Sequence, residues 1–354
     1  MRTRERFSLS GLLPEDISEL LTAEPRYRSL QIFEWIHAKR ISSFTGMTTL
    51  PSRLREELSS SYHVRGASLH ALLQDPGDET IKAQVRLQDG QIVEAVVLTD
   101  GKGRKTACLS TQAGCAMGCA FCNTGQLGFS RNLTPGEIVD QWLILQDTAG
   151  PLSHIVFMGM GEPLLNLANL RKAISILSHE RGSRLSLRRI TVSTCGIVPG
   201  ILSLAEEGPH VRLAFSLTSA RPEVRKQLMP VEARHPLDHV KEALLRYQAA
   251  TGKRITLEVV AIEGLTCTPE ESRAIAGFAE GLRVLVNVIP WNPVPGLPYR
   301  PPSPAALSSF VSSLTKKALT VTVRYRKGQH IHGACGQLGV VTPRKTHREA
   351  GARP

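Results

Sequence analysis

The chain has 354 residues, of which 42% are hydrophobic and 21% are charged, a composition typical of a globular protein. Its formal net charge of +12 favours a polyanionic partner such as nucleic acid, although a generally basic proteome would explain the charge equally well. No run of 18 apolar residues is present, and the N-terminus MRTRERFSLS lacks the apolar core of a signal peptide, so we expect a cytoplasmic protein without membrane contact.

The N-terminal part predicts helices followed by a hairpin. Helical spacing of apolar residues occurs in SGLLPEDISELLTA, PRYRSLQIFEWIHAKR and PSRLREELSSSY, and Pro51 stands where the third helix would open. AQVRLQDG and QIVEAVVLTDG then alternate around Asp89–Gly90, which predicts a β-hairpin. We therefore expect a helical domain over residues 1–65 and a β-hairpin extension over residues 66–104.

From residue 106 onward, strand and helix patterns alternate along the chain. The expected strands are TACLS (106–110), HIVFM (154–158), RITVST (189–194), VRLAFSL (211–217), ITLEVVA (255–261) and VLVNVI (284–289). Such units predict an α/β fold in which a parallel sheet curls into a partial (β/α)6 barrel over residues 105–300.

The C-terminal part predicts an extension of this barrel. Residues 290–304 contain too many prolines for regular structure. A helix near 304–317 and a strand at 320–326 are expected to precede the glycine-rich segment GACGQLG, within a C-terminal extension over residues 301–341. The basic tail over residues 342–354 is expected to be disordered.

Cys115, Cys119 and Cys122 form a C-x3-C-x2-C pattern in the segment GCAMGCAFCNTG. Three thiolates on one short loop can hold three irons of a 4Fe–4S cluster and leave the fourth iron open. That open iron can bind the amino and carboxylate groups of S-adenosylmethionine. A structural zinc site needs four closed ligands, usually in two pairs, and no second pair follows. The spacing therefore favours an iron–sulfur cluster over a zinc site or a chance grouping.

Polar and glycine residues follow several expected strands at their carboxyl ends, where ligands bind in parallel α/β folds. Gly161 and Glu162 follow the second strand, Ser193 the third, Ser216 the fourth and Asn292 the sixth. Taken singly, each has an ordinary explanation as part of a turn or as a helix cap. Their common placement indicates a ligand site.

The segments GCAMGCAFCNTGQLGFSRNLTPGEI, FMGMGEPL, NVIPWNPVPGLPY and ACGQLG resemble the RlmN/Cfr family of radical-SAM RNA methyltransferases, over nearly the whole chain. The N-terminal unit resembles that family's helix-hairpin-helix-like RNA-binding module. The resemblance implies an enzyme (EC 2.1.1.-) that methylates an adenosine carbon in RNA, with one 4Fe–4S cluster and two molecules of S-adenosylmethionine per turnover. The implied product is 2-methyladenosine in 23S rRNA, with a tRNA adenosine as a second target.

The resemblance also assigns roles to individual residues. It makes Cys335 the methyl carrier, which passes through S-methylcysteine and a covalent protein–RNA adduct, and Cys108 the resolving thiol, which leaves a disulfide. Glu94 matches the proton acceptor. The positions that match the binding site for S-adenosylmethionine are Gly161, Glu162, Ser193, Ser216, Leu217, Thr218 and Asn292. The flanking glycines Gly333 and Gly336 predict a carrier loop that can open.

Some of these residues also have explanations that do not depend on the family resemblance. Without the family pattern, Cys108 would be a small buried residue in a strand, and Glu94 a solvated charge on a hairpin. Cys195 and Cys267 match no family cysteine, and we expect them to be structural.

The chain departs from the usual family pattern near the cofactor and the carrier loop. Thr218 stands in SLTSA where the family usually has histidine, and AIEGLTCTPEE lacks the usual Asn–Asp pair. Gln329 and His330 in KGQHIHGACGQL replace an acidic residue that usually precedes the carrier cysteine.

Clusters of cations are the candidate phosphate contacts for RNA, although solvated faces are the default for each cluster alone. They are Lys102, Arg104 and Lys105; Arg184, Arg188 and Arg189; and Arg324, Arg326 and Lys327. We expect a monomer that receives electrons from a flavodoxin or ferredoxin. The alternatives are Cfr-like methylation at carbon 8, an inactive RNA-binding paralogue, and radical chemistry on a substrate other than RNA.

Overall fold

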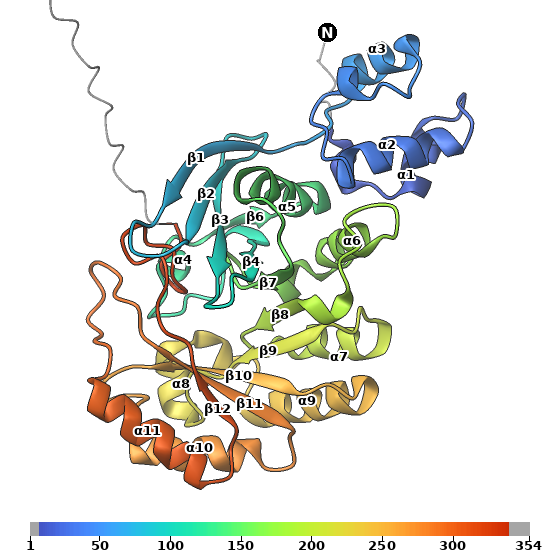
Figure 1. Cartoon of the computed structure of the whole chain (residues 1–354). Helices are drawn as coiled ribbons and strands as arrows, with labels where there is room; N and C mark the ends of the chain where they lie inside the picture. The colour runs from blue at the N-terminus through green and yellow to red at the C-terminus, as the bar shows by residue number, and fades with distance from the viewer. Residues whose placement is uncertain (1–6, 340–354) are drawn as a thin grey trace, which may run out of the picture.

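The computed structural model describes residues 7–339, which form a small helical N-terminal unit and a larger α/β unit (Figure 1). The tail over residues 342–354, expected to be disordered, lies outside the described residues. Within residues 7–339, no helix is long and apolar enough to cross a membrane.

The expected N-terminal helices are present as α1 (Pro14–Leu20), α2 (Tyr27–His37) and α3 (Ser52–Ser61). Helix α3 begins one residue after Pro51, which therefore occupies the cap position rather than the first turn. The unit packs on helix α5 (Pro135–Ala149) through two glycines: a Cβ on Gly11 would lie 2.6 Å from the Gly136 nitrogen. Close approach at this point joins the unit to the rest of the protein.

Over residues 7–339, the main sheet has ten strands and begins with an antiparallel part made of β1 (Ser68–Gln74), β2 (Ile81–Arg86) and β3 (Ile92–Thr99). The hairpin expected around Asp89–Gly90 is confirmed, with β2 antiparallel to β3. The sequence does not predict strand β1, because SLHALLQ lacks the alternation of a strand with one buried face. In the structure, Leu69 and Leu72 of this strand are exposed. This part is continuous with the barrel, since β3 pairs with β4 (Lys105–Cys108).

The remaining strands of this sheet are parallel, and every strand expected between residues 106 and 289 is confirmed. After β4 they are β7 (His154–Phe157), β8 (Ile190–Thr194), β9 (Arg212–Ser216), β10 (Ile255–Ala261), β11 (Val284–Pro290) and β12 (Val321–Val323). The helices that connect or follow them are α5, α6 (Leu167–Ser178), α7 (Val198–Glu207), α8 (Pro222–Leu228), α9 (Leu237–Thr251), α10 (Pro269–Ala279) and α11 (Pro304–Lys316). Residues 291–303 form neither helix nor strand, as their prolines predict.

The sheet is curled, as expected for a partial barrel. Cys108 of β4 and Val323 of β12 line one cavity, although they lie at opposite ends of the parallel part. In a flat sheet, strands separated by six spacings would lie about 29 Å apart. The interior of the curl therefore holds the cavity, and the helices cover its outside (Figure 1).

A small sheet and a short helix bracket the cysteine loop. Strands β5 (Gln112–Gly114) and β6 (Phe129–Asn132) pair across it, and α4 (Asn123–Gln126) follows Cys122. Gly114 has φ of +76°, and a Cβ there would lie 2.0 Å from the Gly128 carbonyl oxygen. Such short strands have too few residues for a visible alternation, so the sequence did not predict them.

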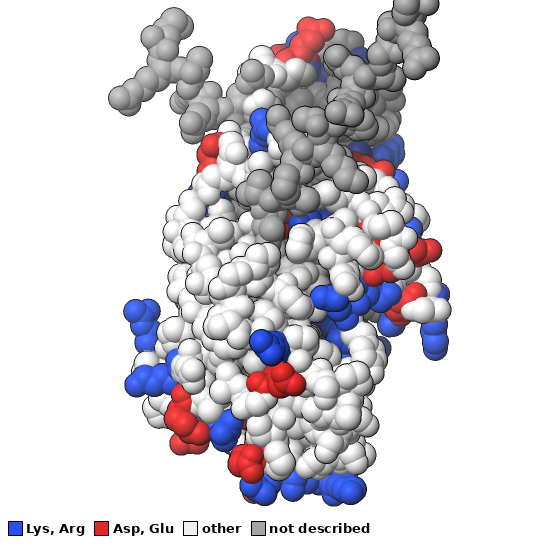
Figure 2. Space-filling model, turned by 90° about the vertical axis from the view of Figure 1, so that its left-hand side faces the viewer, with Lys and Arg blue, Asp and Glu red and all other residues white. Residues whose placement is uncertain are grey.

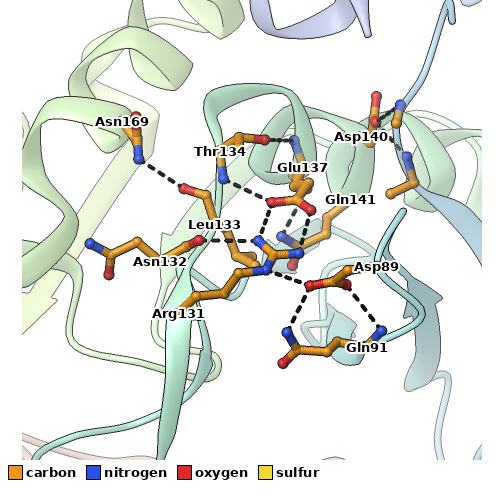
Figure 3. A network of polar contacts seen from close by, with 12 residues as sticks. Asp89, Gln91, Arg131, Asn132, Leu133, Thr134, Glu137, Asp140, Gln141 and Asn169 are labelled. Carbon is orange, nitrogen blue, oxygen red and sulfur yellow. Dashed lines mark hydrogen bonds and ion pairs between the residues drawn. The ribbon is translucent and has the colours of Figure 1, made fainter. Parts of the chain in front are cut away.

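Arg131 of β6 joins the end of the cysteine loop to two other elements (Figure 3). Its Nε donates to Asp89 of the β2–β3 turn at 2.6 Å, and its two Nη atoms donate to the two carboxylate oxygens of Glu137 in α5, each at 2.8 Å. Glu137 also closes a capping box with Thr134. Hydrogen bonding to Arg131 is the largest influence on Asp89 and lowers its pKa to about 2.

We predict that Arg131→Met destabilises the protein by about 2 kcal/mol, because two carboxylates lose charge-assisted hydrogen bonds. Chemical denaturation measures this change, and hydrogen exchange of residues 112–132 should become faster. Arg273→Met is the matched control, since Arg273 forms an exposed pair with Glu270 within one helix. Equal stability of the two variants would contradict the structural role of Arg131.

Candidate functional site

Two adjoining cavities lie inside the curled sheet in the described part of the chain. The smaller, of about 170 Å³, contains Cys115, Cys119 and Cys122 in its wall, and we call it the cysteine cavity. The larger, of about 470 Å³, contains Cys108 and Cys335, and we call it the carrier cavity. The two cavities share a wall made of Met158, Ile289, Arg324 and Cys335.

The cysteine cavity brings together the three thiols of the C-x3-C-x2-C pattern. Burial raises the pKa of Cys115 to about 11 and is also the main cause that raises the pKa values of Cys119 and Cys122. Among the described residues, no group of three or more His, Cys, Asp or Glu side chains is placed so that it could hold a single metal ion. A 4Fe–4S cluster makes a different demand, because each of its thiolates binds a different iron.

Glycines at the end of β7 allow close packing beside these thiols. A Cβ on Gly159 would lie 2.7 Å from the Leu109 carbonyl oxygen, and a Cβ on Gly161, whose φ is +98°, would lie 2.4 Å from the Gln112 Cβ. Both glycines line the cysteine cavity. Larger residues would therefore displace the segment that leads into the cysteine loop.

Thr218 lines the same cavity and has a hydroxyl that suits a ligand. Thr218 is fully buried, and its Oγ1 has no hydrogen-bond partner in the structure. A buried hydroxyl without a partner is costly, and a polar ligand in the cavity would supply one. With the three thiols and the glycine cradle, this hydroxyl fits a cluster and a polar cofactor.

Glu162 lies in the wall of the cysteine cavity, and both its carboxylate oxygens accept backbone N–H groups. Cys195 N–H donates to Oε2 at 2.8 Å, and Leu164 N–H donates to Oε1 at 3.0 Å. Burial raises the pKa of Glu162. Cys195, expected to be structural, also lines this cavity, whereas the half-buried Cys267 lies near Ala306, away from both cavities.

The other predicted cofactor positions divide between the two cavities. Ser193 and Ser216 line the cysteine cavity, as their place at strand ends predicted. Leu217 is fully buried and lies behind the wall, where its carbonyl accepts from Arg225 at 2.9 Å. Asn292 lines the carrier cavity instead, and its Nδ2 donates to the Cys335 carbonyl at 2.9 Å.

Arg225 holds the loops that follow β8 and β9, and the sequence analysis missed it. Its guanidinium is fully buried, pairs with Glu232 at 2.9 Å, and donates to the carbonyls of Ser216, Leu217 and Cys195. Ser193 and Ser216 lie at the ends of these strands, and Thr218 lies in the loop after β9. The buried arginine therefore fixes the backbone of these loops. In the sequence, the spacing of Arg225 within α8 is the one signal that could have indicated this role.

Cys108 and Cys335, far apart in sequence, meet in the wall of the carrier cavity. Burial raises the pKa of Cys108 to about 12, and the nearby Cys335 adds to that effect. The Cys108 thiol is therefore protonated at neutral pH in this state. Arg324 lies between the cavities, and the Coulombic attraction of Cys335 is the main cause that raises its pKa.

The segment that carries Cys335, residues 328–339, is closed in this structure. Asn123 N–H donates to the Gly336 carbonyl at 2.8 Å, Thr124 donates to the Leu338 carbonyl at 2.9 Å, and Gln337 donates to Pro293 at 2.7 Å. The opening predicted from its flanking glycines is thus not the state seen here. We call these residues the carrier segment.

Glu94 is buried rather than solvated, and it lies outside the walls of both cavities as the described residues form them. Its Oε1 is 3.1 Å from the Lys82 ammonium, and its Oε2 accepts the Gly339 N–H at 2.7 Å. The carboxylate therefore contacts the end of the carrier segment.

Cations line the outer part of the carrier cavity. They include Arg104, Arg326 and Lys327, beside Tyr325, whose side chain is 72% exposed. Arg324 differs from the expected phosphate contact, because it lies inside, with Nη1 3.8 Å from the Met158 sulfur. On one face of the molecule, Lys and Arg side chains stand in separate groups around a largely uncharged surface (Figure 2).

Comparisons with known proteins identify the family that this chain resembles. Residues 109–271 match the Radical SAM superfamily, and residues 9–64 match the ribosomal RNA large subunit methyltransferase N-terminal domain. The probable dual-specificity RNA methyltransferase RlmN of Treponema pallidum is 45% identical over 332 residues, which cover 94% of this chain and 97% of that protein. The protein of the same name from Treponema denticola is 46% identical over 337 residues, covering 95% and 96%.

A solved structure is similar over the same extent. The crystal structure of a radical SAM methyltransferase from Sphaerobacter thermophilus is 39% identical, with a TM-score of 0.91, and the match covers 94% of this chain and 99% of that chain. These comparisons confirm the α/β radical-SAM fold, and that superfamily implies a 4Fe–4S cluster and S-adenosylmethionine. The chain belongs to the RlmN family of radical SAM RNA methyltransferases.

Proposed function

We propose that this protein methylates carbon 2 of an adenosine in 23S rRNA, and of a tRNA adenosine as a second substrate, through S-methylcysteine at Cys335. The observation that carries the proposal is the shared cavity of Cys108 and Cys335 beside the cysteine cavity. The relatives are named as probable dual-specificity RNA methyltransferases, which supports two classes of RNA substrate.

Cys115, Cys119 and Cys122 would hold the cluster, and the walls formed by Gly161, Ser193, Ser216 and Thr218 would hold S-adenosylmethionine. When bound, these groups supply the methyl group and the radical that activates it. Glu162 keeps its carboxylate fixed by two backbone N–H groups, so its remaining lone pairs can face an ammonium group.

Cys335 lies in the wall that the two cavities share, which suits a carrier that must face both. Its sulfur would accept the methyl group that S-adenosylmethionine supplies, with S-adenosylhomocysteine as the leaving group. That methyl group would lose one hydrogen atom to the radical, and the resulting methylene radical would add to the adenine carbon. The adduct would then give up one electron, which the cluster can accept, and the proton of the ring carbon. The base is thereby joined to the protein through the Cys335 sulfur, because the C–S bond is intact at this stage.

Cys108 then releases the product. Its thiolate attacks the Cys335 sulfur, the S–CH2 bond breaks, and its electron pair goes to the carbon, which a proton converts to methyl. Glu94 is the proposed acceptor of the proton that leaves the ring carbon, and it can reach the base only if the carrier segment moves. A thiol reductant must open the Cys108–Cys335 disulfide before the next cycle.

RNA would enter the carrier cavity past Arg104, Arg326 and Lys327, whose charges suit phosphates. The exposed Tyr325 offers a ring on which a base can stack. A monomer, a cytoplasmic location and a flavodoxin or ferredoxin as electron donor stay predictions. Methylation at carbon 8 is the second candidate, because a shared two-cysteine cavity serves either carbon.

We predict that anaerobic reconstitution gives about four irons per protein and that Cys119→Ala abolishes cluster binding, since a three-thiolate site loses one ligand. Iron analysis and visible absorption measure both. Cys267→Ala is the matched control, because Cys267 lies outside both cavities, and it should keep the cluster. Stoichiometric zinc without a cluster would refute the assignment.

We predict that Cys335→Ala eliminates methylated RNA with normal cluster content, whereas Cys108→Ala accumulates protein joined to RNA, because the adduct has no thiolate to resolve it. Denaturing gels of reactions with labelled RNA, followed by mass spectrometry of the linked peptide, measure the adduct. Full turnover by Cys108→Ala without trapped RNA is the contrary result.

We predict that Arg326→Gln weakens RNA binding and lowers the slope of log affinity against log salt by about 1, the change that one lost phosphate contact gives. Fluorescence anisotropy across a salt series measures the slope. Arg273→Gln on the exposed face of α10 is the control and should leave the slope unchanged. An unchanged slope in Arg326→Gln would remove this residue from the RNA interface.

A further inference from the structure

Lys82 is the feature that the proposed reaction leaves unexplained. The residue lies on β2 with 0% of its surface exposed, although lysine is rarely buried without a partner. Its ammonium lies 3.1 Å from Glu94 Oε1 and donates to the His332 carbonyl at 3.5 Å. Burying two charges costs desolvation energy that an apolar residue of similar size would avoid. A buried pair at this point therefore calls for a role beyond packing.

The pair contacts the carrier segment on both sides of Cys335. On the N-terminal side, Lys82 reaches the His332 carbonyl, three residues before the cysteine. On the C-terminal side, Glu94 Oε2 accepts the Gly339 N–H at 2.7 Å, four residues after it. One ion pair thus holds both ends of the short stretch that carries the sulfur.

A second set of contacts holds the beginning of the same segment. Asp75, at the end of β1, accepts the His330 N–H at 2.8 Å and lies 2.9 Å from the His330 Nδ1. Asp78 accepts the Gly328 N–H at 2.9 Å. All these partners come from β2, β3 and the turn between β1 and β2, so the antiparallel part of the sheet contacts the carrier segment along its length.

We propose that Lys82 is a positioning residue that, through Glu94, clamps residues 332–339 and thereby holds the Cys335 sulfur in the wall between the two cavities. The proposal rests on the proposed function only in naming Cys335 as the methyl carrier. A sulfur that must face a methyl donor in one cavity and a base in the other tolerates little displacement, because reacting atoms must be held in near-contact geometry. Lys82 itself is too deeply buried to touch RNA.

The test measures the carrier segment directly, in the full chain with its cluster reconstituted. Alkylation of Cys335 by iodoacetamide is followed by mass spectrometry of the peptide that begins at Gly328, and hydrogen exchange reports the Gly339 amide. Lys82→Met removes the cation with little change in volume. Lys82→Arg keeps a cation within reach of Glu94. Arg86→Met removes a cation from the same strand at an exposed position, away from the carrier segment.

Lys82→Met should accelerate both alkylation of Cys335 and exchange at Gly339 by about tenfold, the effect of losing one charge-assisted contact from a local opening equilibrium. Lys82→Arg should restore both rates most of the way to the wild-type values, and Arg86→Met should leave both rates unchanged. In turnover, Lys82→Met should lower kcat for RNA with little change in KM. Unchanged alkylation and exchange in Lys82→Met would overturn the proposal.

Lys82→Met leaves Glu94 buried without its cation and can fail to fold. The double variant Lys82→Met with Glu94→Gln has no such charge and should show the same acceleration, and wild-type rates in it would equally overturn the clamp. These measurements need no turnover. If Cys335→Ala still gave product, the carrier role would fail while the clamp could still be measured, so the two failures are distinguishable.

Discussion

In a parallel sheet, the carboxyl ends of neighbouring strands lie at the same edge, and this constraint positions the whole site. The glycines after β7 and the serines of β8 and β9 meet because their strands are adjacent and parallel. Curling of the sheet then brings β4 near β11 and β12, so that Cys108 shares a cavity with Asn292 and Val323. Without the curl, Cys108 on β4 would lie far from β12 and from the segment after it that carries Cys335.

The antiparallel strands add what the parallel sheet lacks. They supply Asp75, Lys82 and Glu94, whose charged groups hold the carrier segment against the interior of the barrel. Burial has a chemical consequence as well, because it raises the pKa of Cys108 to about 12 and keeps the thiol protonated. For the resolving role proposed for Cys108, a protonated thiol in the closed state is protected from premature oxidation, and motion of the carrier segment would expose it.

The sequence predicted the parallel strands, the N-terminal helices and the hairpin because each has a strong local pattern. It missed β1, which has no fully buried face and exposes Leu69 and Leu72, and it missed β5 and β6, which are too short to show alternation. Cys115, Cys119 and Cys122 share one cavity, and Cys108 and Cys335 share another. No local pattern predicts the second pairing, because it depends on the curl of the sheet.

Other residues of the site could not be found from local sequence. Lys82 and Arg225 look like ordinary surface cations in a strand and a helix, and only tertiary packing buries them. From the sequence, we expect Glu94 to face solvent or the base. In the structure its carboxylate pairs with the buried Lys82 and accepts the Gly339 N–H. Asn292, which stays a predicted cofactor contact, also donates to the Cys335 carbonyl, and no local pattern indicates that hydrogen bond.

Peptide mapping under non-reducing conditions, after a single anaerobic turnover of the wild-type protein on RNA, tests the two-cysteine mechanism most directly. We expect one new disulfide, between Cys108 and Cys335, in an amount equal to the methylated adenosine formed. Methylated adenosine formed while both thiols stay free, or while either forms a disulfide with another cysteine, would contradict this mechanism.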